Sequence, residues 1–203
     1  PSPPPPSPPP SPPPPRLRIH VWPACNTSLT DSATTCNSLA DGLLELHAID
    51  QPIPVELVLN DGVYEDDVSG GPIGSGLMTI NASVRVSSLV LTAADQVATL
   101  RAPSGATRSI LTVAEGAPPT TVRNLRFEES NHVPAVTLAA SSRLEMSSCS
   151  FVSNARSAIE MRAGELVLSS CAFSSNGGSL ASGGALNVGS LDKDAAPLSV
   201  TIR

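Results

Sequence analysis

Short stretches of alternating apolar and polar residues recur in the second half of the chain at a nearly constant distance. Three of them contain a phenylalanine that an asparagine soon follows. The repeat length of roughly 22–24 residues is typical of a β-solenoid, in which equivalent residues of successive coils stack in ladders. The expected ladders comprise Phe127, Phe151, Phe173, Asn131, Asn154 and Asn176.

The same alternation continues, less regularly, upstream of these repeats. The stretches 87–93, 97–103 and 109–116 carry apolar residues at alternate positions and are interpreted as further coils. At this period, residues 55–203 predict about six coils. Leucine-rich repeats have a similar period, but their leucine and asparagine consensus is missing here. Because a strand pattern is still open at Arg203, we expect the solenoid to continue beyond it or to pair with another chain.

A strand and a helix are predicted ahead of the coils. Leu17, Ile19 and Val21 alternate with polar residues over 16–22, as in a short strand. Leucines at helical spacing predict an amphipathic helix over about 34–48, which Gly42 weakens. Ser or Asp residues at its start can act as N-caps. Such a helix would cover the apolar cross-section of the first coil, whose strand edge is otherwise unpaired.

Two stretches resemble known β-helix families. "NDGVYED" (60–66) follows the predicted helix and a strand, and it resembles the beginning of right-handed parallel β-helix proteins with the pectin-lyase-like fold. "FSSN" (173–176) with "GGAL" (183–186) is similar to the repeats of polymorphic outer-membrane proteins, whereas the copy at 151 keeps only the first half. These resemblances imply an all-β chain that forms a right-handed parallel β-helix with an N-terminal capping helix.

The first fifteen residues are twelve prolines and three serines. Proline lacks an amide proton and has a fixed φ, so this segment is expected to form a polyproline II rod about 45 Å long. It can serve as a plain spacer, as a ligand for SH3 or WW domains, or as a glycosylated rod. We therefore divide the chain into a rod (1–15), a strand, disulfide loop and capping helix (16–54), and a β-helix (55–203).

The "SPPPP" blocks resemble extensins and the hydroxyproline-rich cell-wall glycoproteins of plants and green algae. This resemblance implies hydroxylation and short attached sugars in the rod. The candidate positions are Ser2, Ser7, Ser11, Pro3, Pro4, Pro5, Pro6, Pro8, Pro9, Pro10, Pro12, Pro13, Pro14 and Pro15. Two sequons, at Asn26 and Asn81, are candidates for N-glycosylation in a secreted protein.

The four cysteines fall into two pairs. Cys25 and Cys36 lie near each other in the sequence ahead of the helix, and a disulfide between them is expected in a secreted chain. Cys149 and Cys171 would occupy the same position of adjacent coils, as either a disulfide or a ladder of buried thiols. No pair has the CxxC spacing, which argues against a zinc site.

Composition and charge exclude several classes of function. The chain of 203 residues has a formal net charge of −6, whereas nucleic-acid binding needs a basic surface. Aromatic residues make up 2% of the chain, so its core must come from Val, Leu, Ile and Ala. No apolar run approaches the roughly 18 residues of a membrane span. No signal peptide is visible, and because the chain begins at Pro1 we expect a processed chain or a fragment.

The acidic residues do not form an obvious catalytic arrangement. One cluster lies in the first turn, and we interpret it as a solvated turn rather than a calcium site. Its members are Asp61, Glu65, Asp66 and Asp67. Other acids, including Glu128 and Glu129, are scattered, and none of the three histidines lies in a nucleophile motif. We therefore expect no catalytic residue, metal or cofactor.

These features favour an extracellular structural glycoprotein, a subunit of a cell wall, matrix or cell-surface fibril. The resemblance of its two halves points to a green alga. Its expected partners are other copies or chains of the assembly and covalently attached glycans. One alternative is a carbohydrate-binding adhesin. Another is a fragment of a β-helix polysaccharide lyase or hydrolase whose catalytic coils lie beyond residue 203.

Overall fold

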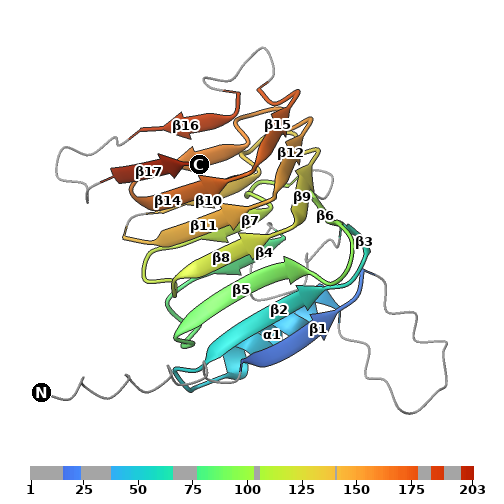
Figure 1. Cartoon of the computed structure of the whole chain (residues 1–203), viewed down its shortest axis with the longest axis vertical. Coiled ribbons are helices and arrows are strands. Elements are labelled where there is room, and N and C mark those ends of the chain that lie inside the picture. The colour runs from blue at the N-terminus through green and yellow to red at the C-terminus, as the bar shows by residue number, and fades with distance from the viewer. Residues whose placement is uncertain are drawn as a thin grey trace, which may run out of the picture.

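The computed structural model describes residues 16–23, 38–65, 77–102, 106–139, 141–177, 184–189 and 198–203. In these ranges the chain is mostly β-strand, and its strands form three parallel sheets (Figure 1). The prediction of a largely β chain with parallel strands is therefore confirmed. The proline-rich segment 1–15 lies outside the described residues, and so do Cys25, Asn26 and Cys36.

The first sheet has seven strands and the other two have five each. The first consists of β1 (Leu17–Val21), β2 (Pro54–Leu59), β5 (Ser88–Ala93), β8 (Thr120–Arg123), β11 (Arg143–Ser147), β14 (Gly164–Ser169) and β17 (Leu198–Ile202). The second consists of β3 (Gly62–Tyr64), β6 (Ala98–Arg101), β9 (Leu125–Glu128), β12 (Ser150–Val152) and β15 (Ala172–Ser174). The third consists of β4 (Met78–Ile80), β7 (Leu111–Val113), β10 (Val136–Leu138), β13 (Ile159–Met161) and β16 (Leu186–Val188).

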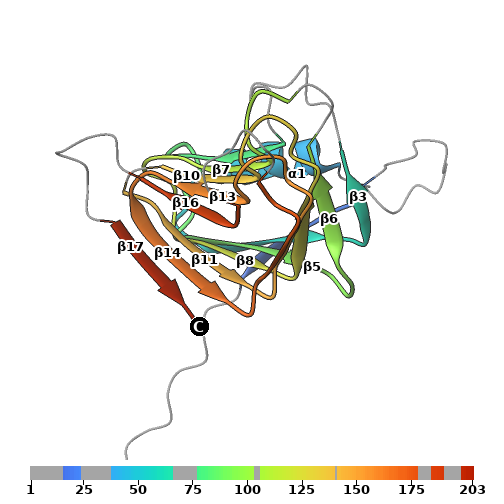
Figure 2. The same cartoon turned by 90° about the horizontal axis from the view of Figure 1, so that it is seen from above.

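From β2 onward the chain visits the three sheets in the same order again and again, and we call one such passage a coil. In the described part of the chain, five coils run from β2–β4 to β14–β16, and β17 begins the next. Each strand pairs in parallel with the strand three places later. Seen along the stack, the strands of successive coils overlie one another around a common interior (Figure 2).

Coil length varies along the stack. Leu144 pairs with Thr120, and Leu166 pairs with Leu144. These two register offsets equal the two spacings between the phenylalanines. The offsets are larger where Leu89 pairs with Val55, Thr120 with Leu89 and Leu198 with Gly164, so the first, second and last described coils are longer than the two between them. The regular period therefore matches the third and fourth coils and underestimates the length of the other three.

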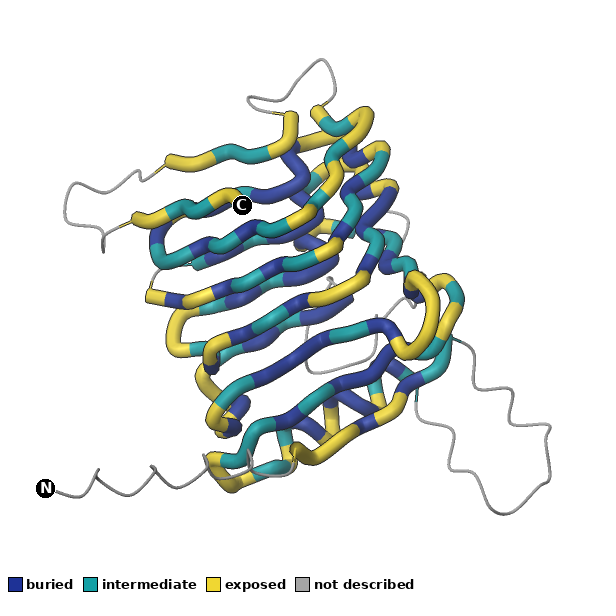
Figure 3. Tube along the Cα trace, in the orientation of Figure 1, coloured by how far each residue is buried: buried dark blue, intermediate teal, exposed yellow. Residues whose placement is uncertain are grey.

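The interior is filled by side chains from alternate strand positions. In β4, β7, β10 and β13 the first and third residues are buried and the second is partly exposed. Buried aliphatic residues from all three sheets belong to one continuous core, which appears as dark blue bands in Figure 3. Because successive side chains of a strand point to opposite faces, each strand contributes every second residue to this core.

Two corners of each regular coil are turned by a residue with positive φ. Ser148 has a φ of 53° and Ser153 a φ of 54°, and both are the residue directly after a strand. The amide of Ser148 donates to Ser169 O at 3.0 Å, and the amide of Ser153 donates to Ser174 O at 3.1 Å, so the corners also bond from coil to coil. The equivalent corner residues in neighbouring coils are Asn124, Ser170, Glu129 and Ser175.

Helix α1 (Leu39–Ala48) covers the interior at the N-terminal end of the stack, beside β1 and β2 (Figure 1). Asp41 N donates to Ser38 Oγ at 3.1 Å, and Ser38 N donates to Asp41 Oδ2 at 3.0 Å. This capping box makes Leu39 the first helical residue, whereas the leucine spacing predicted a beginning near residue 34. The buried side of the helix consists of Leu39, Gly42, Leu43 and Leu46.

Gly42 allows α1 to lie close to β1 and β2. A Cβ atom at Gly42 would lie 2.3 Å from Val21 Cγ1 and 3.2 Å from Leu57 Cδ1. Gly42→Ala should therefore lower the free energy of unfolding by about 1–3 kcal/mol through overpacking, although alanine is the better helix former by about 1 kcal/mol. Denaturant titration measures this change.

The matched control is Leu44→Ala at a position of the same helix that is 51% exposed. It should change the free energy of unfolding by less than about 0.5 kcal/mol. A Gly42→Ala variant more stable than the wild type would contradict the close packing of helix and sheet.

Candidate functional site

The second sheet carries the side chains that connect successive coils most extensively. On its inner face, Phe127, Phe151 and Phe173 stack, with ring centroids 5.1 and 4.9 Å apart and interplanar angles of 11° and 3°. These distances are close to the roughly 4.8 Å between neighbouring strands, so strand pairing itself brings the rings face to face. Leu100 and Tyr64 continue the same inner row toward the helix.

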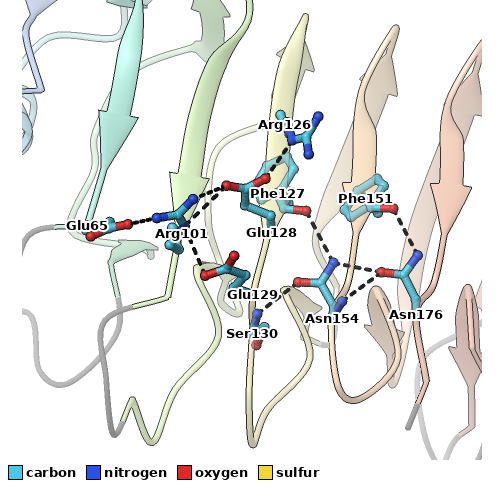
Figure 4. A network of polar contacts seen from close by, with 10 residues as sticks. All are labelled: Glu65, Arg101, Arg126, Phe127, Glu128, Glu129, Ser130, Phe151, Asn154 and Asn176. Atoms are coloured by element: carbon cyan, nitrogen blue, oxygen red, sulfur yellow. Dashed lines mark hydrogen bonds and ion pairs between the residues drawn. The ribbon is translucent and has the colours of Figure 1, made fainter.

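Two of the three expected asparagines form an amide ladder where the chain leaves the second sheet. Asn154 Nδ2 donates to Asn176 Oδ1 at 2.8 Å and to Phe127 O at 3.2 Å, and Asn176 Nδ2 donates to Phe151 O at 3.0 Å. Asn154 Oδ1 accepts from Ser130 N at 3.1 Å (Figure 4). Because Asn154 is completely buried, its side chain satisfies two backbone groups of the preceding coil that water does not reach.

Ser130, and not Asn131, occupies the first position of the amide ladder. Val152 pairs with Glu128, so the residue two positions after Glu128 is the equivalent of Asn154. Ser130 is fully buried, whereas Asn131 is exposed. The prediction for Asn131 was wrong. It aligned the three asparagines by residue type and allowed one extra residue between Phe127 and the asparagine, whereas the strand pairing leaves no extra residue at this corner.

An ion-pair network crosses three coils on the outer face of the second sheet (Figure 4). Arg101, at the end of β6, donates to Glu65, which follows β3, and to Glu128 at the end of β9. The Nε atom of Arg101 lies 3.2 Å from a carboxylate oxygen of Glu129, and Arg126 donates to Glu128 at 2.7 Å. Negative and positive charges therefore alternate from coil to coil along this edge.

Glu128 is the most shielded carboxylate of the network, with 8% of the residue exposed. Burial alone would raise the pKa of Glu128, but hydrogen bonds from Arg101 and Arg126 outweigh burial and lower it below the ordinary value. The hydrogen bond to Glu128 in turn raises the pKa of Arg101. Glu128 is therefore ionised and paired near neutral pH, which suits a structural ion pair and not a general acid.

In the sequence alone, Glu128 and Glu129 are interpreted as scattered acids, and nothing singles out Arg101 or Arg126. The network could have been found from the residues that directly follow the inner row of the second sheet in the sequence. Tyr64, Leu100 and Phe127 are equivalent inner residues, and the residue directly after each is Glu, Arg and Glu.

The acidic cluster of the first turn is not assembled as a metal site in the described residues. Asp61 Oδ1 accepts from Gln96 N at 3.0 Å in the next coil, and Glu65 belongs to the ion-pair network. Asp66 and Asp67 lie outside the described residues. Throughout the ranges that the structure describes, no group of three or more His, Cys, Asp and Glu side chains is placed to hold a metal ion.

A hollow of about 310 Å³ opens near the corner between the first and second sheets. Its walls carry one carboxylate and no aromatic ring, so it lacks the flat apolar surface on which a sugar ring stacks. Its lining consists of Ala93, Ala94, Asp95, Gln96, Val97, Asn124 and Ser148.

The remaining candidate residues are placed as follows. Cys149 and Cys171 are both free thiols at equivalent corners of adjacent coils, and Cys149 is 1% exposed. Asn81 follows β4, and its Oδ1 atom accepts from Ser83 N at 2.9 Å and Ser83 Oγ at 2.6 Å. This arrangement engages the oxygen and not the amide nitrogen, to which an N-linked glycan is attached.

The two ends of the described stack differ in chemistry. α1 covers the end that begins with β1, and the exposed positions of this helix include Asp41, Leu44 and Glu45. At the other end, Val188, Leu198 and Ile202 are 41%, 37% and 72% exposed; exposed and partly buried residues predominate in β16 and β17 in Figure 3. The described part of the chain contains no helix with the length and apolarity of a bilayer span.

Asn154→Ala should destabilise the protein by about 2–4 kcal/mol, because it leaves the buried Ser130 N–H and Phe127 C=O without their partner. Denaturant unfolding measures this loss. Asn131→Ala is the matched control, with the same substitution one coil away at an exposed position, and it should have an effect below about 0.5 kcal/mol. Equal effects of the two substitutions would contradict the assignment of Ser130 to the ladder.

Glu128 should make stability depend on acid pH. Its pKa is lower in the folded chain than the ordinary value of 4.5, so its contribution is complete above that value and is lost as pH falls through the folded pKa. The free energy of unfolding should therefore fall less steeply below pH 4.5 in Glu128→Gln than in the wild type. Glu115→Gln, in an exposed turn after β7, should keep the wild-type slope; an unchanged slope in Glu128→Gln would refute this role of the network.

Comparison of the chain with models of protein families, with curated proteins and with solved structures finds no match. What the protein does is therefore inferred from its ladders, its ion-pair network and its proline-rich segment.

Proposed function

We propose that this protein is a structural extracellular glycoprotein, a subunit of a cell wall, matrix or cell-surface fibril. In this proposal a glycosylated proline-rich rod precedes a right-handed parallel β-helix. The observation that carries the proposal is that the prominent side-chain contacts of the second sheet run between successive coils: the ring stack, the amide ladder and the ion-pair network. Such contacts stiffen a stack along its length.

The β-helix interpretation is supported by the order of the strands. From β2 onward each sheet contains every third strand, and all pairings are parallel, so the connection between paired strands of successive coils passes through the other two sheets. Connections between parallel strands of one sheet are right-handed in about 98% of cases. A right-handed helical path of the backbone is therefore the expected one.

Ion pairs on the first sheet support a stiffening role in the same way. Arg18 and Glu56, which are paired residues of β1 and β2, are 2.7 Å apart. Arg143 and Glu165, on the paired strands β11 and β14, are 3.6 Å apart. Each such pair contributes little alone when it is exposed, but both join neighbouring strands along the stack and neither requires a bound molecule.

The extracellular assignment is supported by the proline-rich segment. Fifteen residues of only Pro and Ser cannot contribute to a sheet or a helix, and their similarity to extensins favours a rod coated with sugars. The alternative of a carbohydrate-active enzyme is less well supported, because Glu65, Glu128 and Glu129 are engaged by arginine. The alternative of an adhesin lacks aromatic side chains around the hollow at the sheet corner.

Mass spectrometry of the natively produced protein tests this proposal. The tryptic peptide 1–16 should contain hydroxyproline bearing pentose or hexose, and the proline-free peptide 86–101 from the same digest is the unmodified control. Unmodified proline in peptide 1–16 would refute the glycosylated rod. It would leave a spacer or a ligand for a proline-binding domain, and would favour the adhesin or enzyme alternatives.

A further inference from the structure

Cys149 and Cys171 face each other across two adjacent coils. Ser148 and Ser170 precede them with nearly the same positive φ, 53° and 52°, so both cysteines occupy the same corner position. Ala172 N donates to Cys149 O at 2.9 Å, which holds the second corner directly on the first. At a strand separation of about 4.8 Å, the two Cα atoms lie within the range of about 4.4–6.8 Å that a disulfide spans.

The two thiols differ in their surroundings. Cys149 is 1% exposed, and its Sγ atom lies 3.4 Å from Ser147 O and 3.6 Å from Val122 O. Cys171 is only partly buried, because it lies in the last described coil of the second sheet. A reagent in solution therefore reaches Cys171 before it reaches Cys149.

The two thiols also influence each other's pKa values. A hydrogen bond from Cys149 is the largest influence on Cys171 and lowers its pKa to about 6. The same hydrogen bond, followed by burial, raises the pKa of Cys149. The pair thus holds one proton near neutral pH, with the thiolate on the accessible sulfur.

We propose that Cys149 and Cys171 form a redox-active pair, in which Cys171 attacks a small-molecule disulfide and Cys149 closes a bond between adjacent coils. In the first step, the Cys171 thiolate attacks one sulfur of the disulfide, a mixed disulfide forms and one small thiolate leaves. In the second step, Cys149 gives its proton to that thiolate, attacks Cys171 Sγ and expels the second small thiolate. Two protein sulfurs are oxidised and one small disulfide is reduced to one thiol and one thiolate, and the thiolate then takes a proton from water.

The second step is helped by the first. While Cys171 is a thiolate, its hydrogen bond keeps the proton on Cys149. Once Cys171 is part of the mixed disulfide, this influence is gone and Cys149 loses its proton more readily, at the moment when it must become the nucleophile. The product ties two coils together through a ring that contains one complete coil. This inference does not depend on the proposed structural function.

The test uses the full chain, reduced and then exposed to glutathione disulfide under native conditions. After acid quenching and alkylation, tryptic digestion without reduction should yield peptides 144–156 and 163–193 joined by a disulfide. Cys25 and Cys36 both fall in peptide 19–85, so they do not confuse the result. The two peptides recovered separately, each alkylated or carrying its own glutathione, would overturn the proposal.

Two variants separate the roles of the cysteines. Cys149→Ser should stop at the mixed disulfide on Cys171. Cys171→Ser should leave Cys149 at least tenfold slower to react than Cys171 is in the wild type. Equal reaction rates of the two sulfurs, or a cross-link that forms only in denaturant, would refute the assignment. Oxidation should also raise the denaturant concentration of unfolding more in the wild type than in Cys149→Ser, in which only Cys25 and Cys36 can form an intramolecular disulfide at paired positions.

Discussion

Backbone hydrogen bonds between the parallel strands of successive coils are the constraint on which the rest of this structure depends. They hold neighbouring coils at one distance and in one register, so that each side chain lies directly above its equivalent in the coil before. At that distance aromatic rings stack on each other, side-chain amides hydrogen-bond to each other, and charged side chains need neighbours of opposite charge. The stacking of Phe127, Phe151 and Phe173, the contact of Asn154 with Asn176 and the pairing of Arg101 with Glu128 follow from this one condition.

The same constraint explains which parts of the structure were predictable. A phenylalanine that recurs once in each later coil reports the register directly, because strand pairing places the three rings at equivalent positions, where they stack. The register also decides between Ser130 and Asn131, but only through pairing of the strand before them, which residue types alone do not reveal. The ion-pair network was not predicted because its members come from three coils of unequal length. The beginning of helix α1 depends on one capping box that the leucine pattern does not contain.

The outer face of the second sheet shows how charge is used in this protein. Three glutamates and two arginines gather there, an arrangement that in a cleft would suggest catalysis. Here they lie along a sheet, each acid is within reach of an arginine, and the most shielded carboxylate is held in its ionised form. Their arrangement matches the neutral ladders beside them, since it also links coil to coil. Neutral and charged side chains thus serve the same purpose of alignment.

The direction of the inter-strand hydrogen bonds also has a mechanical consequence. The strands run across the stack, whereas the bonds between them run along it from coil to coil. Tension applied along the stack therefore loads the interfaces between coils in series, and the weakest interface sets the yield force of the whole. A bond between Cys149 and Cys171 would remove one interface from that series and move the point of failure to another pair of coils.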